Sequence, residues 1–134
     1  MRIDNQNPSF TNVSYDQKKT RGTNAIKLYK STGQQLLTWQ QRQIKAIEAI
    51  NKDGLWKHMT YCICVSRRNG KGEILAAREM DGLINLGEKI CHTAHRTTTS
   101  HDAFNRLYTL LKKAGYEEHS KKKKKMLLRF VRKK

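Results

Sequence analysis

The feature that most constrains this chain is the segment Tyr61–Glu73, where an apolar run gives way to a short polar loop that ends in Gly-Lys. A helical pattern of apolar residues follows the lysine. Proteins hold the phosphates of a nucleotide on this order of strand, loop and helix, with a lysine at the end of the loop. The segment therefore predicts a phosphate-binding loop.

The match to the full phosphate-loop pattern is partial. That pattern is Gly, four residues, Gly-Lys and then Ser or Thr. Gly70 and Lys71 fit, whereas Val65 stands in place of the first glycine and Gly72 in place of the hydroxyl residue. Because that hydroxyl binds Mg²⁺, we expect nucleotide binding with impaired metal-assisted hydrolysis. The alternative is a Gly-Lys turn without a ligand, and the local pattern leaves both open.

Four residues of the loop have a physical role if the loop binds phosphate. The first N–H groups of a helix lack intrahelical partners and suit phosphate oxygens. Gly70 lets the backbone turn and approach a ligand closely, and Lys71 can reach the outer phosphates. Arg67 and Arg68 add positive charge. A guanidinium beside the phosphates could stabilise charge during phosphoryl transfer.

The pattern along the rest of the chain predicts an α/β fold. Apolar periodicity predicts helices over 34–51, 71–86 and 99–114, and a short helix near Ala25–Tyr29, with Gly22 and Gly33 as breaks. Apolar runs predict strands over 55–65 and 88–94. Alternation of this kind indicates a parallel sheet with crossover helices. Two strands do not complete such a sheet, so the fold is expected to be incomplete.

Composition divides the chain into three parts. The 134 residues suffice for one domain with a modest core. We expect a polar N-terminal segment (1–33), a domain (34–120) and a basic tail (121–134) that holds nine basic residues and no acid. The net charge of +17 predicts attraction to polyanions, such as nucleic acid, nucleotides or an anionic membrane, without choosing between them.

The remaining composition favours a cytoplasmic protein without a membrane span. Cys62, Cys64 and Cys91 form no CxxC pair and lie in apolar runs, which indicates core thiols in a reducing compartment. No apolar stretch has the length of a signal peptide or a spanning helix. Cys91 and the nearby histidines lack a second ligand pair, so no metal site is predicted.

Several segments together resemble the terminase large subunits of tailed phages and prophages. The string Ser66–Lys71 followed by Glu73-Ile74-Leu75 is similar to their Walker A region, in which the first glycine is often missing and an arginine is present. The resemblance covers 14–118, and its other parts are Ser14–Asp16, Lys18–Asn24, Trp39-Gln40 and His92–Phe104.

The resemblance implies a two-domain motor that packages DNA. An N-terminal ATPase of the additional-strand P-loop class would drive double-stranded DNA into a procapsid, and a C-terminal nuclease would cut it. The cofactors would be ATP and Mg²⁺. The partners would be double-stranded DNA, the portal protein and the small terminase subunit, in the cytoplasm of a bacterial host. Whether this chain is itself an enzyme stays open.

The family's site residues carry over by position. Lys71 would hold phosphates, and Arg67 would match the loop arginine that acts in catalysis or coupling. The other nucleotide-binding positions are the loop residues Ser66, Arg68, Asn69, Gly70 and Gly72, together with Trp39 and Gln40, which resemble the adenine-sensing Q motif. For Gln40 the alternative is a residue at the helix border that is bonded to the backbone.

The departures from the family predict a fragment. No apolar run that ends in Asp-Glu, as a Walker B strand would, follows Ala94, and no nuclease domain is present. The resemblance stops where the run Lys121–Lys125 begins. Lysine codons are adenine-rich and prone to slippage, so we expect residues after Ser120 to be out of frame and hydrolysis to be weak or lost. The alternative is a genuine basic arm on a small nucleic-acid-binding protein.

Overall fold

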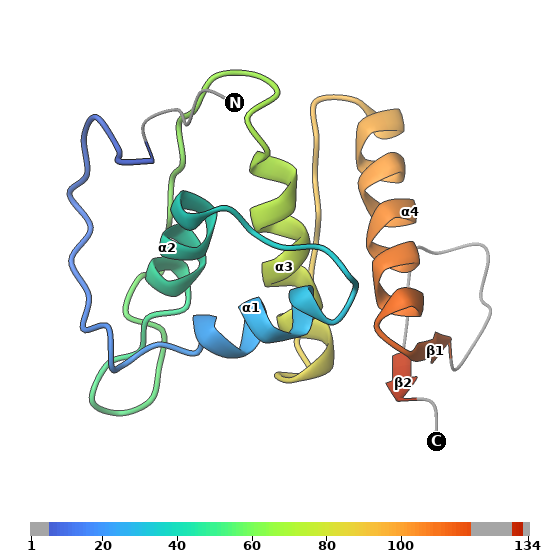
Figure 1. Cartoon of the computed structure of the whole chain (residues 1–134), viewed down its shortest axis with the longest axis horizontal. Helices are drawn as coiled ribbons and strands as arrows, with labels where there is room; N and C mark the ends of the chain where they lie inside the picture. The colour runs from blue at the N-terminus through green and yellow to red at the C-terminus, as the bar shows by residue number, and fades with distance from the viewer. Residues whose placement is uncertain (1–5, 119–129, 133–134) are drawn as a thin grey trace.

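A computed structural model describes residues 6–118 and 130–132 of the chain. The fold is built from helices and one short strand pair at the C-terminal side (Figure 1). In chain order the elements are α1 (Gly22–Lys30), α2 (Thr38–Ile47), α3 (Lys71–Ile84), α4 (Thr97–Lys113), β1 (Tyr116–Glu118) and β2 (Phe130–Arg132).

Helix α3 is the centre of the fold, and α1, α2 and α4 all pack against it. Its residues Ile74, Ala77 and Met80 are fully buried at helical spacing, so one face of α3 forms the middle of the core. The core cluster is completed by Ala76 of α3, by Leu36 just before α2, and by side chains of the surrounding helices, which are Ala25, Tyr29, Ile44, Leu107, Leu110 and Leu111.

The predicted parallel sheet is wrong for the part of the chain that the structure describes. The only sheet there is antiparallel and pairs β1 with β2, with Glu117 opposite Val131. The predicted strands 55–65 and 88–94 form no ladder. They run as extended segments in the same direction, opposite to α3 (Figure 1). The described residues thus form a mainly helical fold and not a P-loop α/β sheet.

The reason is that neither extended segment is paired with another strand among the residues that the structure describes. A ladder needs strands side by side, and within the described chain residues 58–65 and 89–95 make no backbone–backbone hydrogen bond. In the first segment only alternate side chains face the core: Ile63 packs against it, whereas Cys62 and Cys64 are exposed. Cys91 is exposed as well, so the expectation of core thiols is also wrong.

The helix predictions are largely confirmed. Helices α3 and α4 coincide with 71–86 and 99–114 to within a few residues, and α1 contains the expected turn at Ala25–Tyr29. Helix α2 is shorter than 34–51 at both ends: it begins at Thr38, and after Ile47 the chain leaves the helix for an isolated bridge between Ala49 and Thr20.

Gly22 is not a break but the first residue of α1. A Cβ there would lie 2.6 Å from the Cα of Lys45, so the close approach of α1 to α2 requires glycine at this position. The segment 1–33 therefore contributes α1 to the common core. The predicted frameshift after Ser120 concerns residues that, except for β2, lie outside those described.

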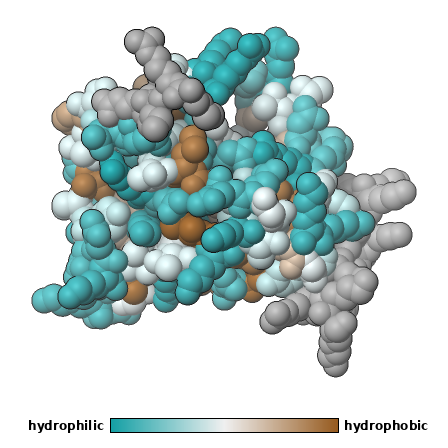
Figure 2. Space-filling model, in the orientation of Figure 1, coloured by the Kyte–Doolittle hydropathy of each residue, from teal (hydrophilic) through white to brown (hydrophobic). Residues whose placement is uncertain are grey.

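The surface is mostly hydrophilic on the face in Figure 2, where apolar side chains gather in a narrow band. Within the residues that the structure covers, no helix combines the length and the apolar character that crossing a membrane requires.

Candidate functional site

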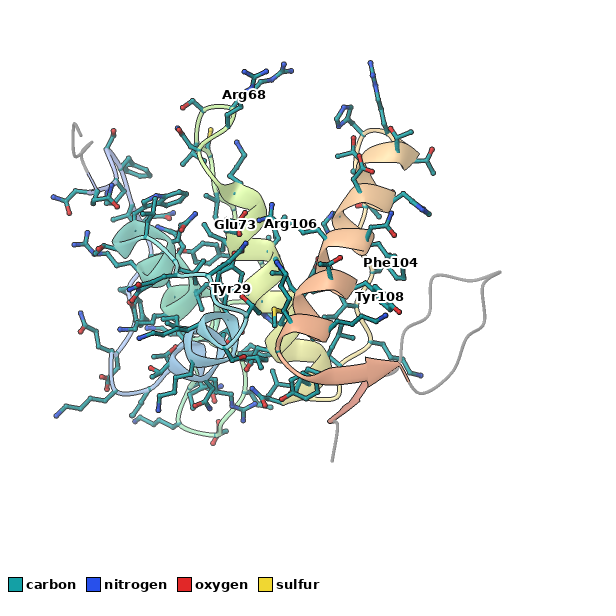
Figure 3. The ribbon with its side chains drawn as sticks, turned by 45° about the vertical axis from the view of Figure 1, so that its right-hand side comes forward. Tyr29, Arg68, Glu73, Phe104, Arg106 and Tyr108 are labelled. Atoms are coloured by element: carbon teal, nitrogen blue, oxygen red, sulfur yellow. The ribbon has the colours of Figure 1, made fainter. Side chains whose placement is uncertain are left out.

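The predicted phosphate-binding loop joins the extended segment that ends at Val65 to the start of α3 (Figure 3). Two of its residues have left-handed backbone, Arg68 with φ 62° and Gly70 with φ 79°. Glycine adopts this conformation without a steric penalty. Gly70 is the residue that caps α3, so its conformation directs the chain into the helix at Lys71.

Lys71 lies across the base of the loop. Its Nζ donates hydrogen bonds to the backbone oxygen of Val65 at 2.6 Å and to that of Ser66 at 3.2 Å. The side-chain amide of Asn69 donates to the hydroxyl of Ser66, which closes the loop from the other side. The structure thus places Ser66, Asn69, Gly70 and Lys71 in one loop at the N-terminus of α3, with the ammonium group of Lys71 bonded to its backbone.

Arg67 and Arg68 lie at the tip of this loop and are exposed. Figure 3 shows the side chain of Arg68 projecting away from the body of the protein. Neither arginine forms an ion pair with any residue that the structure describes. Two arginines and Lys71 therefore give the loop a positive field with no acidic residue between 66 and 72.

Gly72 occupies the second position of α3, and a Cβ built there would have no neighbour within 4 Å. The position has room for a hydroxyl side chain but supplies none. Across residues 6–118 and 130–132, no three His, Cys, Asp or Glu side chains are placed to hold a metal ion. The acidic group nearest in sequence, Glu73, contacts Tyr29 and Arg106. These donors do not fit the Mg²⁺ that a complete phosphate loop would bind.

The two residues matched to the Q motif, Trp39 and Gln40, make different contacts. The carboxamide oxygen of Gln40 accepts the backbone N–H of Leu37 at 2.7 Å, and its Nε2 donates to the backbone oxygen of Gly70 at 3.0 Å. The side chain is 3% exposed. Trp39 is half-buried and packs against the core. Of the two residues matched to the Q motif, Gln40 is bonded to the loop and Trp39 packs against the core.

A cluster that the sequence did not predict ties three helices together just behind the loop. Glu73 of α3 contacts the hydroxyl of Tyr29 from α1 and the guanidinium of Arg106 from α4, and Figure 3 shows the three side chains converging. Burial, reinforced by Glu73, raises the pKa of Tyr29, so the phenol stays protonated. The partners are 44 and 33 residues from Glu73, so no local pattern could have indicated them.

A second buried polar cluster joins the far ends of α2 and α3. Glu48 is completely buried and Asp81 is 1% exposed. The Nε of Arg78 lies 3.6 Å from Glu48, and its Nη1 lies 2.8 Å from Glu88. Burial and then the charge of Asp81 raise the pKa of Glu48 to about 8. This carboxyl is therefore mostly protonated at neutral pH.

Two surface cavities lie away from the loop. One, of about 580 Å³, is lined by residues of α3 and of the segment 88–91, and the other, of about 500 Å³, is lined by residues of α1 and of the chain around the end of α4. No residue of the loop lines either cavity. They are not continuations of the loop site.

Comparison with known protein families, with curated proteins and with solved structures gave no match to this chain.

Proposed function

We propose that the loop Ser66–Gly72 binds the polyphosphate of a nucleotide, ATP in the first instance. The observation that carries this proposal is the position of Lys71. Its ammonium group lies at the N-terminus of α3 and is bonded to two backbone oxygens of the loop. Phosphate oxygens can replace these carbonyls as acceptors and form stronger, charge-assisted hydrogen bonds.

Charge supports the same reading. Arg67 and Arg68 are exposed at the loop tip, and the N-terminus of α3 contributes the positive end of the helix dipole. Glu73, the one acid in the first turn, contacts Arg106, which offsets its charge. An anion at the loop therefore meets cations on several sides.

The resemblance to terminase large subunits extends the proposal to a biological role. In that role the chain is the nucleotide-binding part of a motor that moves double-stranded DNA into procapsids, working in the cytoplasm of a bacterial host. Its partners are the portal protein and the small terminase subunit. Arg67 is the candidate catalytic residue. Gly72 supplies no side-chain oxygen for Mg²⁺, so we expect binding with little hydrolysis by this chain alone.

The test is a titration of the full chain with ATP and ADP by calorimetry, comparing wild type with Lys71→Ala. Loss of one charge-assisted hydrogen-bonding group should weaken binding about 10- to 100-fold. Lys89→Ala is the matched control, because Lys89 is an exposed lysine outside the loop and its removal changes the net charge equally. Equal affinities of Lys71→Ala and wild type would refute the proposal.

A second candidate is a small basic protein that binds nucleic acid. The exposed arginines of the loop tip and the net charge of +17 favour it. It predicts salt-sensitive DNA binding that survives Lys71→Ala and falls when 121–134 are removed. The two candidates are separated by measuring DNA binding and ATP binding on the same variants.

A further inference from the structure

The side chain of Gln40 forms hydrogen bonds with the backbone of the protein. A carboxamide has one oxygen acceptor and two N–H donors. The oxygen accepts the N–H of Leu37 and the nitrogen donates to the carbonyl of Gly70. Gln40 is only 3% exposed, so its amide is spent on backbone bonds inside the protein and is largely withdrawn from solvent.

The contact lies at the residue that determines the shape of the loop. A Cβ on Gly70 would be 2.6 Å from the Nε2 of Gln40, so the amide lies directly against the Cα of Gly70. Gly70 is left-handed and immediately precedes Lys71, the first residue of α3. The side chain of Gln40 therefore connects the first turn of α2 to the backbone that aims Lys71.

Among the residues that the structure describes, the side chains placed at the loop offer no pattern that would distinguish one base from another. Trp39 packs against the core, and neither surface cavity includes a loop residue. The groups that the loop itself presents are cationic side chains and backbone N–H groups, which recognise phosphate. Recognition through these groups does not depend on the base.

We infer that Gln40 is a positioning residue that holds Gly70 and the phosphate-binding loop in place, and that the loop takes polyphosphates irrespective of the base. The second part rests on the proposed function. The first part does not, because it concerns the conformation of the loop without a ligand.

The experiment compares Gln40→Glu and Gln40→Ala with wild type. Glutamate keeps the shape of the side chain and the acceptor for the N–H of Leu37 but loses the donor to Gly70. The experiment can therefore still be read if Gln40→Ala fails to fold. The matched control is Gln41→Ala, because Gln41 donates to the backbone oxygen of Leu36 at 2.9 Å and does not contact the loop.

The first readout is hydrogen exchange of the peptide that covers 66–72, without ligand. Both Gln40 variants should exchange faster there, while Gln41→Ala should match wild type, since releasing one anchoring hydrogen bond raises the local opening frequency. Unchanged exchange in Gln40→Glu would overturn the positioning role.

The second readout is the affinity for ATP, GTP and inorganic tripolyphosphate. We expect wild type to bind all three within about threefold. Gln40→Ala should lose about five- to tenfold for each, the effect of one hydrogen bond, and Gln40→Glu should lose at least as much, because its carboxylate also repels phosphate. A wild-type preference for ATP that disappears in Gln40→Glu would mean that Gln40 reads the base, which overturns the inference. If wild type binds none of the three ligands, both the proposed function and the base-independent binding are refuted. The exchange data would still decide whether Gln40 positions the loop.

Discussion

Removing the buried carboxyl of Glu48 should stabilise the protein at alkaline pH. Glu48 is completely buried and lies near Asp81, and its pKa rises from 4.5 to about 8. Each unit of pKa shift corresponds to about 1.4 kcal/mol, so the rise amounts to at most about 5 kcal/mol. That is a large part of the total stability of a small domain.

The sign follows from proton linkage. The folded state binds the proton of Glu48 more tightly than the unfolded state does, so this group's contribution is fully present below pH 4.5 and is lost as the pH rises through 8. Above pH 8 the native state contains a buried carboxylate next to Asp81, and the cation beside it among the described residues is the partly exposed Arg78. Glutamine has nearly the same shape and no proton to lose, so Glu48→Gln removes this pH dependence.

The assay is urea unfolding, followed by circular dichroism at pH 6.0, 7.5 and 9.0, of wild type and Glu48→Gln. We expect the free energy of unfolding of the variant to exceed that of wild type by a few kcal/mol at pH 9.0 and by less at pH 6.0. Asp102→Asn, an exposed acid, is the control for the change in net charge and should follow the wild-type curve. Parallel pH curves for wild type and Glu48→Gln would refute the reasoning.

Three further predictions concern single positions. Gly72→Ser should make ATP binding stronger in the presence of Mg²⁺ than in its absence, since the open space there admits the missing hydroxyl; an equal effect in Gly72→Ala would contradict this. Gly22→Ala should lower the free energy of unfolding by about 1–3 kcal/mol because its Cβ would collide with the backbone of Lys45; thermal melting checks this, and an unchanged midpoint would count against it. In the native protein a thiol reagent should titrate all three cysteines at the rate of free thiols, because each is exposed. Slow reaction would contradict this exposure and would indicate that the extended segments are covered.

The helices and the loop were predictable because each is encoded in neighbouring residues. The spacing of Ile74 and Ala77 marks the buried face of α3, and Gly70 followed by Lys71 marks the turn into that helix. These signals need only a few residues in a row. The exposed segment containing Cys62 and Cys64 shows the limit, because an apolar run predicts a strand only if another strand lies beside it.

The sequence by itself determined which segments are helical, where the loop Ser66–Gly72 lies, and that Gly72 lacks a hydroxyl. Only the tertiary structure decided that Gln40 holds Gly70, that Glu73 joins Tyr29 to Arg106, and that the extended segments form no sheet. The physical reason is that helical periodicity and turn chemistry act between near neighbours along the chain. Contacts over 30 or more residues depend instead on how whole helices pack.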